Sequence, residues 1–259
     1  IHKKKVRHHL IDICELDETY SAARFCEDAQ KAVLEIRSRG KVPLLVGGTG
    51  LYFKSFLYGL SRLPKSDPNI RYQLEKDLER VGLEELHKKL RTLDPSAAER
   101  IHKRDTQRIM RALEVCLLSG DTITSLFDIK VQKNMLLKPL KFVLYFEDRD
   151  YLREYLQERF ISMLGNGLIN EISFLRWKKN LIEMPAAFRS VGYREVWNYL
   201  ENRLDYQEMV SKAVVASSQL AKRQTTWFKR ESNSIRCESS DEETLFVKII
   251  KEIEKSKIF

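Results

Sequence analysis

The sequence has few of the features that define several common protein classes. It has four cysteines, Cys14, Cys26, Cys116 and Cys237, and no C-x-x-C pair. This pattern excludes a disulfide-dense secreted domain, disfavours a zinc site and is typical of reduced thiols in a cytoplasmic protein. No apolar run reaches the length of a membrane span, and no signal-peptide core follows the basic start. We therefore expect a cytoplasmic protein without a membrane partner.

Catalytic signatures are also scarce. The five histidines include no H-E-x-x-H motif, and no G-K-[ST] motif of a nucleotide-binding P-loop occurs. No Ser-His-Asp set, paired-carboxylate site or metal cluster stands out. The first residue is Ile1 rather than Met, so we expect that sequence is missing upstream.

The composition is that of a folded and basic protein. Of the 259 residues, 43% are hydrophobic, which is enough for a core. Lys and Arg number 46 against 37 Asp and Glu, which gives a formal net charge of +9. An excess of this size favours a polyanionic partner such as nucleic acid, although a merely basic surface would give the same charge.

The first part of the chain has the pattern of an α/β core. Thr19 can cap an apolar-periodic helix that ends at Gly40, and the run 42–46 predicts a short buried strand. The glycine turn, defined as Gly47–Gly50, follows that run, and a helical period then resumes. The order of helix, strand, glycine turn and helix is typical of a doubly wound α/β fold.

The middle of the chain is different in character. From Asp67 onward the pattern is helical without a strand, with start signals at Asp94-Pro95 and Asp105 and a stop at Gly120. The runs 141–147 and 234–237 then read as strands. We therefore predict an α/β core formed by residues 1–65 and 137–259, with an all-helical insertion domain at 66–136.

Three basic segments are candidates for contacts with a phosphate-rich partner. In 103–115, the residues Arg104, Arg108 and Arg111 recur at helical spacing opposite an apolar stripe, and Gln107 is beside them. A solvated surface face would give the same pattern. The second candidate is Arg159, which takes a position that the stripe of Leu152, Leu156 and Met163 would give to an aliphatic residue.

The third candidate is the segment 217–230. The helical pattern that leads into this segment has a core side formed by Met209, Ala213, Ala216, Leu220 and Trp227. Its polar stripe is formed by Gln219, Arg223, Thr226 and Arg230, with Lys222 beside it. The loop 188–195 adds Arg189, Tyr193 and Arg194 around Gly192, a combination of ring and cations that suits RNA.

Six ordered blocks give these motifs a family context. They are RHHLIDI, YSAARF, VPLLVGGTGLYFKSFLYGL, LDPSAAERIHKRDTQRIMRALEV, VGYREVWNYL and QLAKRQTTWF. Together they resemble the tRNA dimethylallyltransferases, also called tRNA isopentenyltransferases, along almost the whole chain.

The resemblance implies a P-loop NTPase-like parallel-sheet core with a helical insertion that binds the tRNA anticodon arm. It implies Mg²⁺-dependent transfer of a dimethylallyl group from dimethylallyl diphosphate to N6 of the adenosine 3′ of the anticodon, with that base flipped out of the loop. An aspartate acts as general base in this family, and arginine neutralises the departing diphosphate. The expected partners are the tRNA anticodon stem-loop and dimethylallyl diphosphate, and the expected state is a monomer.

The same resemblance assigns roles to residues. Thr49 matches a threonine adjacent to the reacting base, and Arg159 matches an arginine that binds the diphosphate. The positions that match tRNA-contacting residues are Gly50, Gln107, Arg108, Arg111, Arg189, Gly192, Tyr193, Arg194, Gln219, Lys222, Arg223 and Gln224. By this resemblance, the glycine turn lines the site of the flipped adenosine and does not bind phosphate.

The sequence also departs from the family pattern. The family's G-P-T-x-S-G-K-[ST] P-loop and its S-x-D-S aspartate normally precede H-H-L-I-D, and neither occurs here, so the general base and the main Mg²⁺-binding groups are expected upstream of residue 1. Residues 1–259 by themselves are therefore expected to be inactive. The usual A-T-R-Q reads Ala216-Ser217-Ser218-Gln219, and Lys103-Arg104 replaces the usual Pro-Asn. A non-catalytic RNA-binding fragment and a P-loop small-molecule kinase remain the alternatives.

Overall fold

The computed structural model describes residues 6–61, 63–128 and 139–256. It has two compact units: the first is formed by Ile1–Lys54 with Leu137–Phe259, and the second by Ser55–Leu136. The sequence-based boundary at residue 66 falls inside the second unit. The reason is that Leu63 packs against the helical core and the Pro64 carbonyl accepts a hydrogen bond from Arg111 Nη2 at 2.7 Å.

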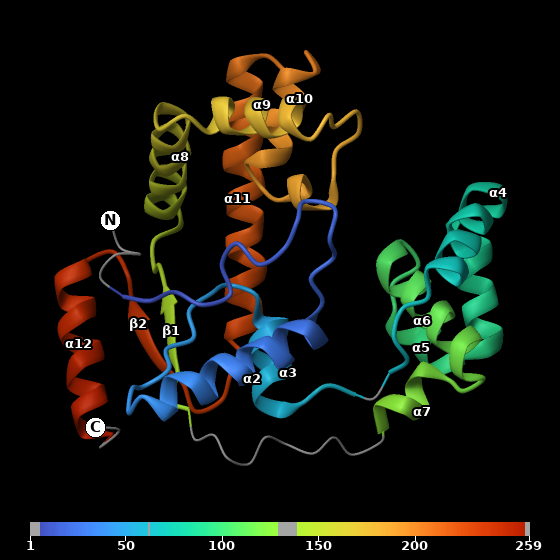
Figure 1. The fold of residues 1–259 in the computed structure, drawn as a ribbon, viewed down its shortest axis with the longest axis horizontal. Coiled ribbons are helices and arrows are strands. Elements are labelled where there is room, and N and C mark those ends of the chain that lie inside the picture. The colour runs from blue at the N-terminus through green and yellow to red at the C-terminus, as the bar shows by residue number, and fades with distance from the viewer. Residues whose placement is uncertain (1–5, 62, 129–138, 257–259) are drawn as a thin grey trace. The chain divides into compact units, whose positions relative to one another are not determined.

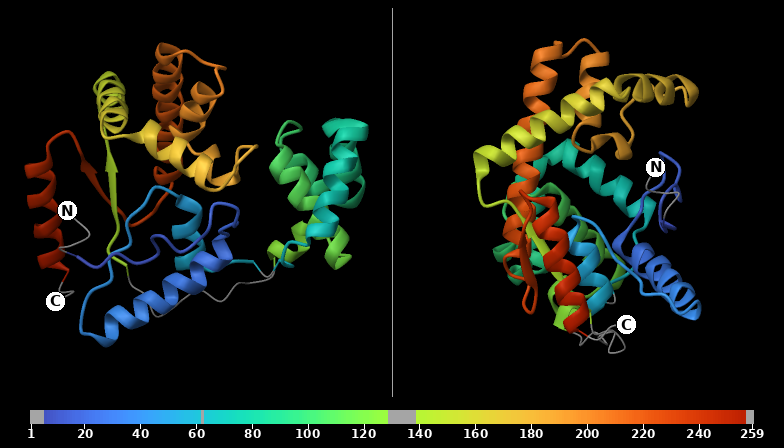
Figure 2. Two further views of the ribbon diagram at one scale, coloured as in Figure 1. Left: turned by 45° about the horizontal axis from the view of Figure 1, so that its top comes forward. Right: turned by 90° about the vertical axis from the view of Figure 1, so that its left-hand side faces the viewer.

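The first unit contains a parallel sheet. Strand β1 (Phe142–Tyr145) pairs with β2 (Ile235–Glu238), with Phe142 opposite Ile235 and Tyr145 opposite Glu238. Helix α12 (Glu242–Lys255) lies beside β2 (Figures 1 and 2). The strands predicted at 141–147 and 234–237 are confirmed, and so is the α/β class with a parallel sheet.

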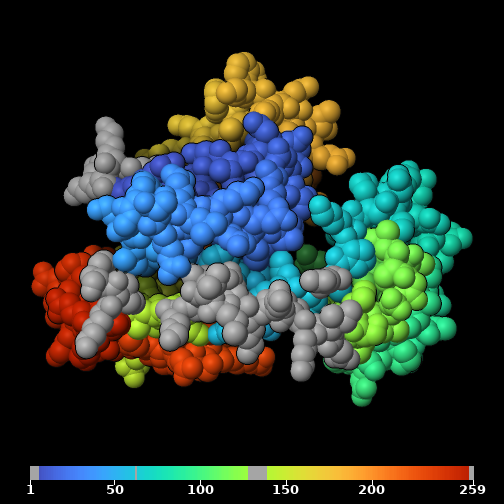
Figure 3. Space-filling model, turned by 60° about the horizontal axis from the view of Figure 1, so that its bottom comes forward, coloured from blue at the N-terminus to red at the C-terminus, as the bar shows by residue number. Residues whose placement is uncertain are grey.

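The predicted strand at 42–46 is wrong. These residues have no regular secondary structure, and Leu44 and Val46 are 82% and 83% exposed. A strand is formed by backbone hydrogen bonds to a neighbour, and neither of the described strands pairs with this run. The apolar pattern was therefore insufficient to make it a strand. Figure 3 shows the blue N-terminal part of the chain on the surface of the first unit.

The helices of the first unit pack around an aromatic cluster. They are α2 (Ala22–Ser38), α8 (Arg149–Gly165), α9 (Leu168–Lys178), the 3₁₀ turn η1 (Ala186–Arg189), α10 (Tyr193–Leu200) and α11 (Tyr206–Phe228). Phe160, Phe188, Trp197 and Met209 are buried where α8 to α11 meet. The N-cap of α2 is Ser21 rather than the predicted Thr19, because the Ser21 hydroxyl accepts a hydrogen bond from the Arg24 amide.

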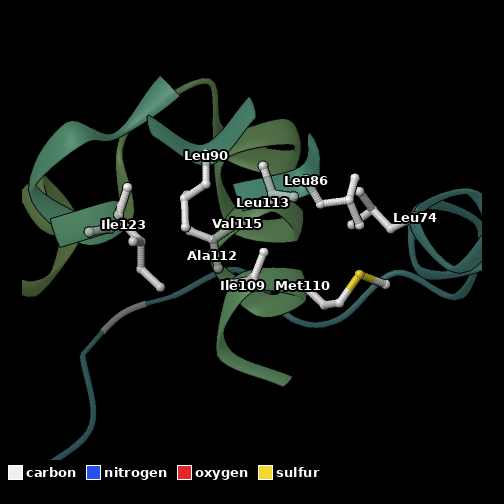
Figure 4. Packing of buried hydrophobic residues seen from close by; sticks show 11 residues of the cluster. Leu74, Leu86, Leu90, Ile109, Met110, Ala112, Leu113, Val115 and Ile123 are labelled. Carbon is white, nitrogen blue, oxygen red and sulfur yellow. The ribbon is translucent and has the colours of Figure 1, made fainter. Parts of the chain in front are cut away.

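The second unit is helical. It contains α4 (Pro68–Leu93), α5 (Pro95–Arg100), α6 (Thr106–Ser119) and α7 (Ile123–Asp128), and α3 (Gly50–Tyr58) spans the boundary between the units. The predicted caps at Asp94, Asp105 and Gly120 are confirmed. Leu74, Leu86, Leu90, Ile109 and Leu113 are among the side chains of its core (Figure 4).

Candidate functional site

The glycine turn is held against the C-terminal half of α11. The Thr49 carbonyl accepts hydrogen bonds from the Tyr52 and Phe53 amides at 3.0 and 3.5 Å, so Thr49 stands at the start of α3. Gln224 donates from Nε2 to the Gly48 carbonyl at 3.2 Å, and the Trp227 indole lies against Gly50. Thr49 itself is exposed, so its side chain is accessible between these two contacts.

The space beside these glycines is occupied by the protein itself. A Cβ at Gly48 would lie 2.1 Å from Gln224 Nε2, and one at Gly50 would lie 2.1 Å from Trp227 Nε1. The sequence-based interpretation attributes the absent side chains to the approach of a flipped base. The structure instead explains Gly48 and Gly50 by the close approach of α11.

Helix α11 changes its environment along its length. Met209, Ala213 and Ala216 are buried as predicted, whereas Leu220 and Trp227 are 38% and 42% exposed. The prediction of a continuous core side is therefore wrong for the C-terminal half. Gln224 and Trp227 continue the same stripe at helical spacing, but there they meet the glycine turn instead of the aromatic cluster.

The basic residues of α11 are exposed. Lys222 and Arg223 have exposed side chains and make no ion pair with any residue that the structure describes. They remain available to an external anion. Gln224, predicted as a tRNA contact, donates to the Gly48 carbonyl, which ties this residue to the turn.

The segment 188–195 is more ordered than the predicted loop. Arg189 ends η1 and is exposed, and Tyr193 begins α10. Gly192 is buried at φ 92°, where a Cβ would meet Phe160 at 3.5 Å, so both its backbone angle and its packing favour glycine. Its amide donates to Glu195 Oε2 at 2.8 Å.

Both polar side chains next to Gly192 have partners within the chain. Arg194 donates from Nε and Nη2 to Oε1 of the buried Glu195, at 2.9 and 2.5 Å. The Tyr193 hydroxyl donates to Glu171. Burial first, and then the hydrogen bond to Glu171, raise the pKa of Tyr193 to about 12, so the phenol is protonated at neutral pH.

A groove between α10 and α11 joins two of the predicted residues. It has a volume of about 320 Å³, and its wall includes Arg194, Gln219 and Lys212. Lys212 is exposed, and sequence reasoning missed it. Its spacing of seven residues from Gln219, two helical turns, was the signal that could have indicated it.

Arg159 lies outside the stripe that suggested it. The packing face of α8 passes through the buried Phe160, while Arg159 is exposed. The prediction that Arg159 takes an inward position is therefore wrong, because the stripe continues from Leu156 to Phe160, one position later. The side chain makes no ion pair within residues 6–61, 63–128 and 139–256, so the guanidinium is accessible to a ligand.

The predicted basic row of α6 belongs to the second unit, and only part of it is a row. Arg104 precedes the helix, which begins at Thr106, so it does not share a helical face with the others. Gln107 is exposed, and Arg108 is exposed with its Nε 3.3 Å from Asp105. Arg111 is half-buried and bound internally, with Nη1 2.6 Å from Glu114 Oε2.

Glu114 is the buried centre of this network, and sequence reasoning missed it. It also accepts hydrogen bonds from the Ser66 hydroxyl and from the Asp67 amide, the latter at 3.2 Å. Burial by itself raises the pKa of the Glu114 carboxyl, but the bonds from Ser66 and Arg111 outweigh it, and the pKa lies below its ordinary value. An acid inside the apolar stripe, three residues after an arginine, was the available signal.

Neither a metal cluster nor a membrane span is found in the part of the chain that the structure describes. There, no group of three or more His, Cys, Asp or Glu side chains could hold a metal ion. None of the described helices combines the length and apolarity needed to cross a membrane.

The sequence of this chain is similar to that of known proteins over most of its length. A family model described as IPP transferase matches residues 2–231. The chain is 42% identical over 234 residues to the tRNA dimethylallyltransferase of Halorhodospira halophila, covering 90% of this chain and 76% of the relative. It is 46% identical over 222 residues to that of Thioalkalivibrio sulfidiphilus, covering 86% and 69%.

Solved structures give the same fold. The tRNA isopentenylpyrophosphate transferase of Bacillus halodurans is 30% identical, with a TM-score of 0.64, over 97% of this chain and 78% of that one. A eukaryotic dimethylallyltransferase acting on tRNA has a TM-score of 0.75 at 21% identity, over 98% and 67% of the two chains. The second likeness concerns the fold alone.

Proposed function

Because this chain belongs to the IPP transferase family, we propose that it transfers a dimethylallyl group from dimethylallyl diphosphate to N6 of the adenosine 3′ of the tRNA anticodon. The product is N6-isopentenyladenosine. The observation that carries this proposal is the match of residues 2–231 to the family model. The basic, exposed face of α11 beside the glycine turn is the physical feature that suits an RNA substrate.

The reaction forms one bond and breaks one. The N6 amine attacks the first carbon of the dimethylallyl group, the carbon–oxygen bond to the diphosphate breaks, and the diphosphate leaves with the electron pair. The amine then loses a proton to a general base. We assign that base to no residue of this chain, because the S-x-D-S motif expected to supply it does not occur in the sequence.

The roles of the chain's own residues follow from their exposure and partners. Thr49 is accessible at the glycine turn and would lie next to the adenosine. Arg159, which is exposed, would bind the departing diphosphate. Lys222, Arg223, Arg189 and Lys212 would contact tRNA phosphates, because all four are exposed cations without an ion pair to any described residue.

Other predicted tRNA contacts divide into two groups. Gln107, Arg108 and Gln219 are exposed and remain candidates for direct contact. Arg194 and Tyr193 are candidates as well, although each also donates a hydrogen bond to a glutamate of the chain. The other predicted contacts also have partners within the fold: Arg111 pairs with Glu114, Gly192 lies against Phe160, Gly50 lies against Trp227, and Gln224 donates to Gly48. We propose that the second unit binds the anticodon arm through the exposed members on α6.

A diphosphate leaving group generally implies a divalent ion, and we propose Mg²⁺. Mg²⁺ binds mainly through substrate phosphates, water and one or two carboxylates. The described residues contain no ready-made metal cluster, so they do not by themselves fit a protein-built metal centre. The ion would take its ligands chiefly from the diphosphate oxygens and would neutralise their charge.

We place the protein in the cytoplasm as a monomer. Its tRNA substrate is found there, and all four cysteines are free, which suits a reducing compartment. The family match does not favour the kinase or the non-catalytic RNA-binding fragment.

The test, made on the full-length protein, is transfer of radiolabelled dimethylallyl from its diphosphate to a tRNA that carries adenosine 3′ of the anticodon. A tRNA with guanosine at that position is the control, since it has no N6 amine. We expect label in the adenosine tRNA alone, and a large loss of rate in Thr49→Val, which keeps the shape of Thr49 but lacks its hydroxyl. Equal labelling of both tRNAs, or tRNA binding without transfer, would contradict the proposal.

A further inference from the structure

Gly50 is a glycine for a reason that lies in the fold. A Cβ at this position would lie 2.1 Å from Nε1, 2.2 Å from Cδ1 and 2.6 Å from Cε2 of Trp227, well inside van der Waals contact. The φ angle of Gly50 is not in the positive region that disfavours other residues. Contact with the indole, and not backbone strain, therefore requires glycine here.

The contact at Gly48 is softer than the contact at Gly50. The Cβ of residue 48 would meet the amide group of Gln224, which is the end of a flexible side chain and could turn away at the loss of one hydrogen bond. An indole ring has only two rotatable bonds and cannot yield in the same way. Next to Trp227, Phe228 packs edge-to-face on Phe53 of α3, with ring centroids 6.3 Å apart.

These contacts bracket Thr49. Gln224 binds the residue before it and Trp227 packs on the residue after it. Both come from the helix that also carries Lys222 and Arg223 on its exposed side. The same helix therefore holds the glycine turn and presents cations to solvent.

We propose that Trp227 is a positioning residue, whose indole sets the place of Gly50 and thereby of Thr49 relative to tRNA bound on α11. This inference rests on the proposed function, in which Thr49 lies beside the reacting adenosine. The indole does not contact the reacting atoms. It fixes the distance between the glycine turn and the exposed face of α11. A displacement of about 1 Å at a reacting centre costs up to about 100-fold in rate, so a rigid ring suits this role.

The experiment is a double-mutant cycle with Gly50→Ala and Trp227→Leu. Gly50→Ala alone should lower kcat by about tenfold or more, with KM for tRNA changed by less than about twofold, because the tRNA contacts of α11 are intact. Trp227→Leu removes the ring atoms that the new Cβ would meet, so the double variant should regain kcat relative to Gly50→Ala. Trp227→Phe should retain more activity than Trp227→Leu, since it keeps a ring.

Two glycine substitutions provide matched controls. Gly165→Ala, at the end of α8, adds a Cβ with nothing within 4 Å and should leave both kinetic constants unchanged. Gly48→Ala should lose less activity than Gly50→Ala, because Gln224 can move. The midpoint of urea unfolding, measured on every variant, should show the same recovery in the double variant.

The inference would be overturned by wild-type kcat in Gly50→Ala, by purely additive effects of the two substitutions, or by a loss confined to KM. A fall in kcat that only mirrors the unfolded fraction would reduce Trp227 to a structural role and overturn it as well. If the wild type transferred no prenyl group, the proposed function and the positioning role would fail together. The Gly50–Trp227 contact would still be decided by additivity or recovery in the urea midpoints.

Discussion

Replacing Arg111 by Ala is expected to destabilise the second unit rather than to weaken contact with tRNA. Arg111 donates to Glu114 Oε2 at 2.6 Å and to the Pro64 carbonyl at 2.7 Å. The Glu114 side chain is 2% exposed. In Arg111→Ala its carboxylate would therefore stay buried without the arginine that pairs with it on α6. Breaking a buried pair costs about 3–5 kcal/mol. Because the Arg111 side chain is 31% exposed and water offsets part of the loss, we expect about 2–3 kcal/mol.

The pH dependence of this loss has a definite sign. The pKa of Glu114 in the folded protein lies below its ordinary value, despite the opposing effect of burial. Stability from such a group is present above the unfolded-state pKa and is lost as pH falls through the folded-state pKa. The difference between wild type and Arg111→Ala should therefore be largest at neutral pH, and it should shrink in acid as the pH falls through the lowered folded-state pKa of Glu114.

The assay is urea unfolding followed by helical circular dichroism, at pH 7 and in acid. Arg111→Lys keeps a charge near Glu114 but loses the donor to Pro64, so we expect a smaller loss of about 1 kcal/mol. Arg108→Ala is the matched control on the same helix. Its side chain is 72% exposed and 3.3 Å from Asp105, so its removal should cost less than about 1 kcal/mol. A loss below about 0.5 kcal/mol for Arg111→Ala, or one that does not shrink in acid, would refute this reasoning.

Two further substitutions test the proposed contacts with the substrates. Arg223→Ala should weaken tRNA binding and reduce the slope of log K against log salt by about one unit, and an unchanged slope would exclude Arg223 from the phosphate contacts. Arg159→Ala should impair the use of dimethylallyl diphosphate with tRNA affinity nearly unchanged, because Arg159 is exposed on α8 whereas the tRNA cations are on α11. Equal loss of both substrates in steady-state kinetics would contradict that assignment.

Local signals predicted the second unit well. Asp94, Asp105 and Gly120 end or begin helices as expected, because a capping side chain or a left-handed glycine acts on its own few residues. The fate of the run 42–46 could not be predicted in this way. Its apolar pattern is compatible with a strand, but a strand also needs a neighbour that the local pattern does not specify.

Arg159 and Gln224 show the same limit at the level of single side chains. Helical spacing assigns a residue to a face only to within about one position along the chain. For this reason the sequence pattern placed Arg159 on the packing face of α8, where the structure has Phe160. Gln224 matches a tRNA-contacting stretch by sequence, yet its amide donates to Gly48, 176 residues away along the chain. Such a partner follows from the tertiary fold and not from the helix that carries the residue.

The glycine turn shows why a glycine motif is ambiguous until its surroundings are known. A missing side chain leaves room that a phosphate, a base or the protein's own side chain can occupy. At Gly50 that room is taken by an indole and at Gly48 by an amide, both from α11. A ligand held at this turn would therefore meet Thr49 and not the glycine backbone on the side where α11 packs. The requirement for glycine and the role of Thr49 then have separate causes. Glycine is required by the packing of α11, whereas Thr49 acts on the substrate. The double-mutant cycle between Gly50 and Trp227 measures how far the role of Thr49 depends on that packing.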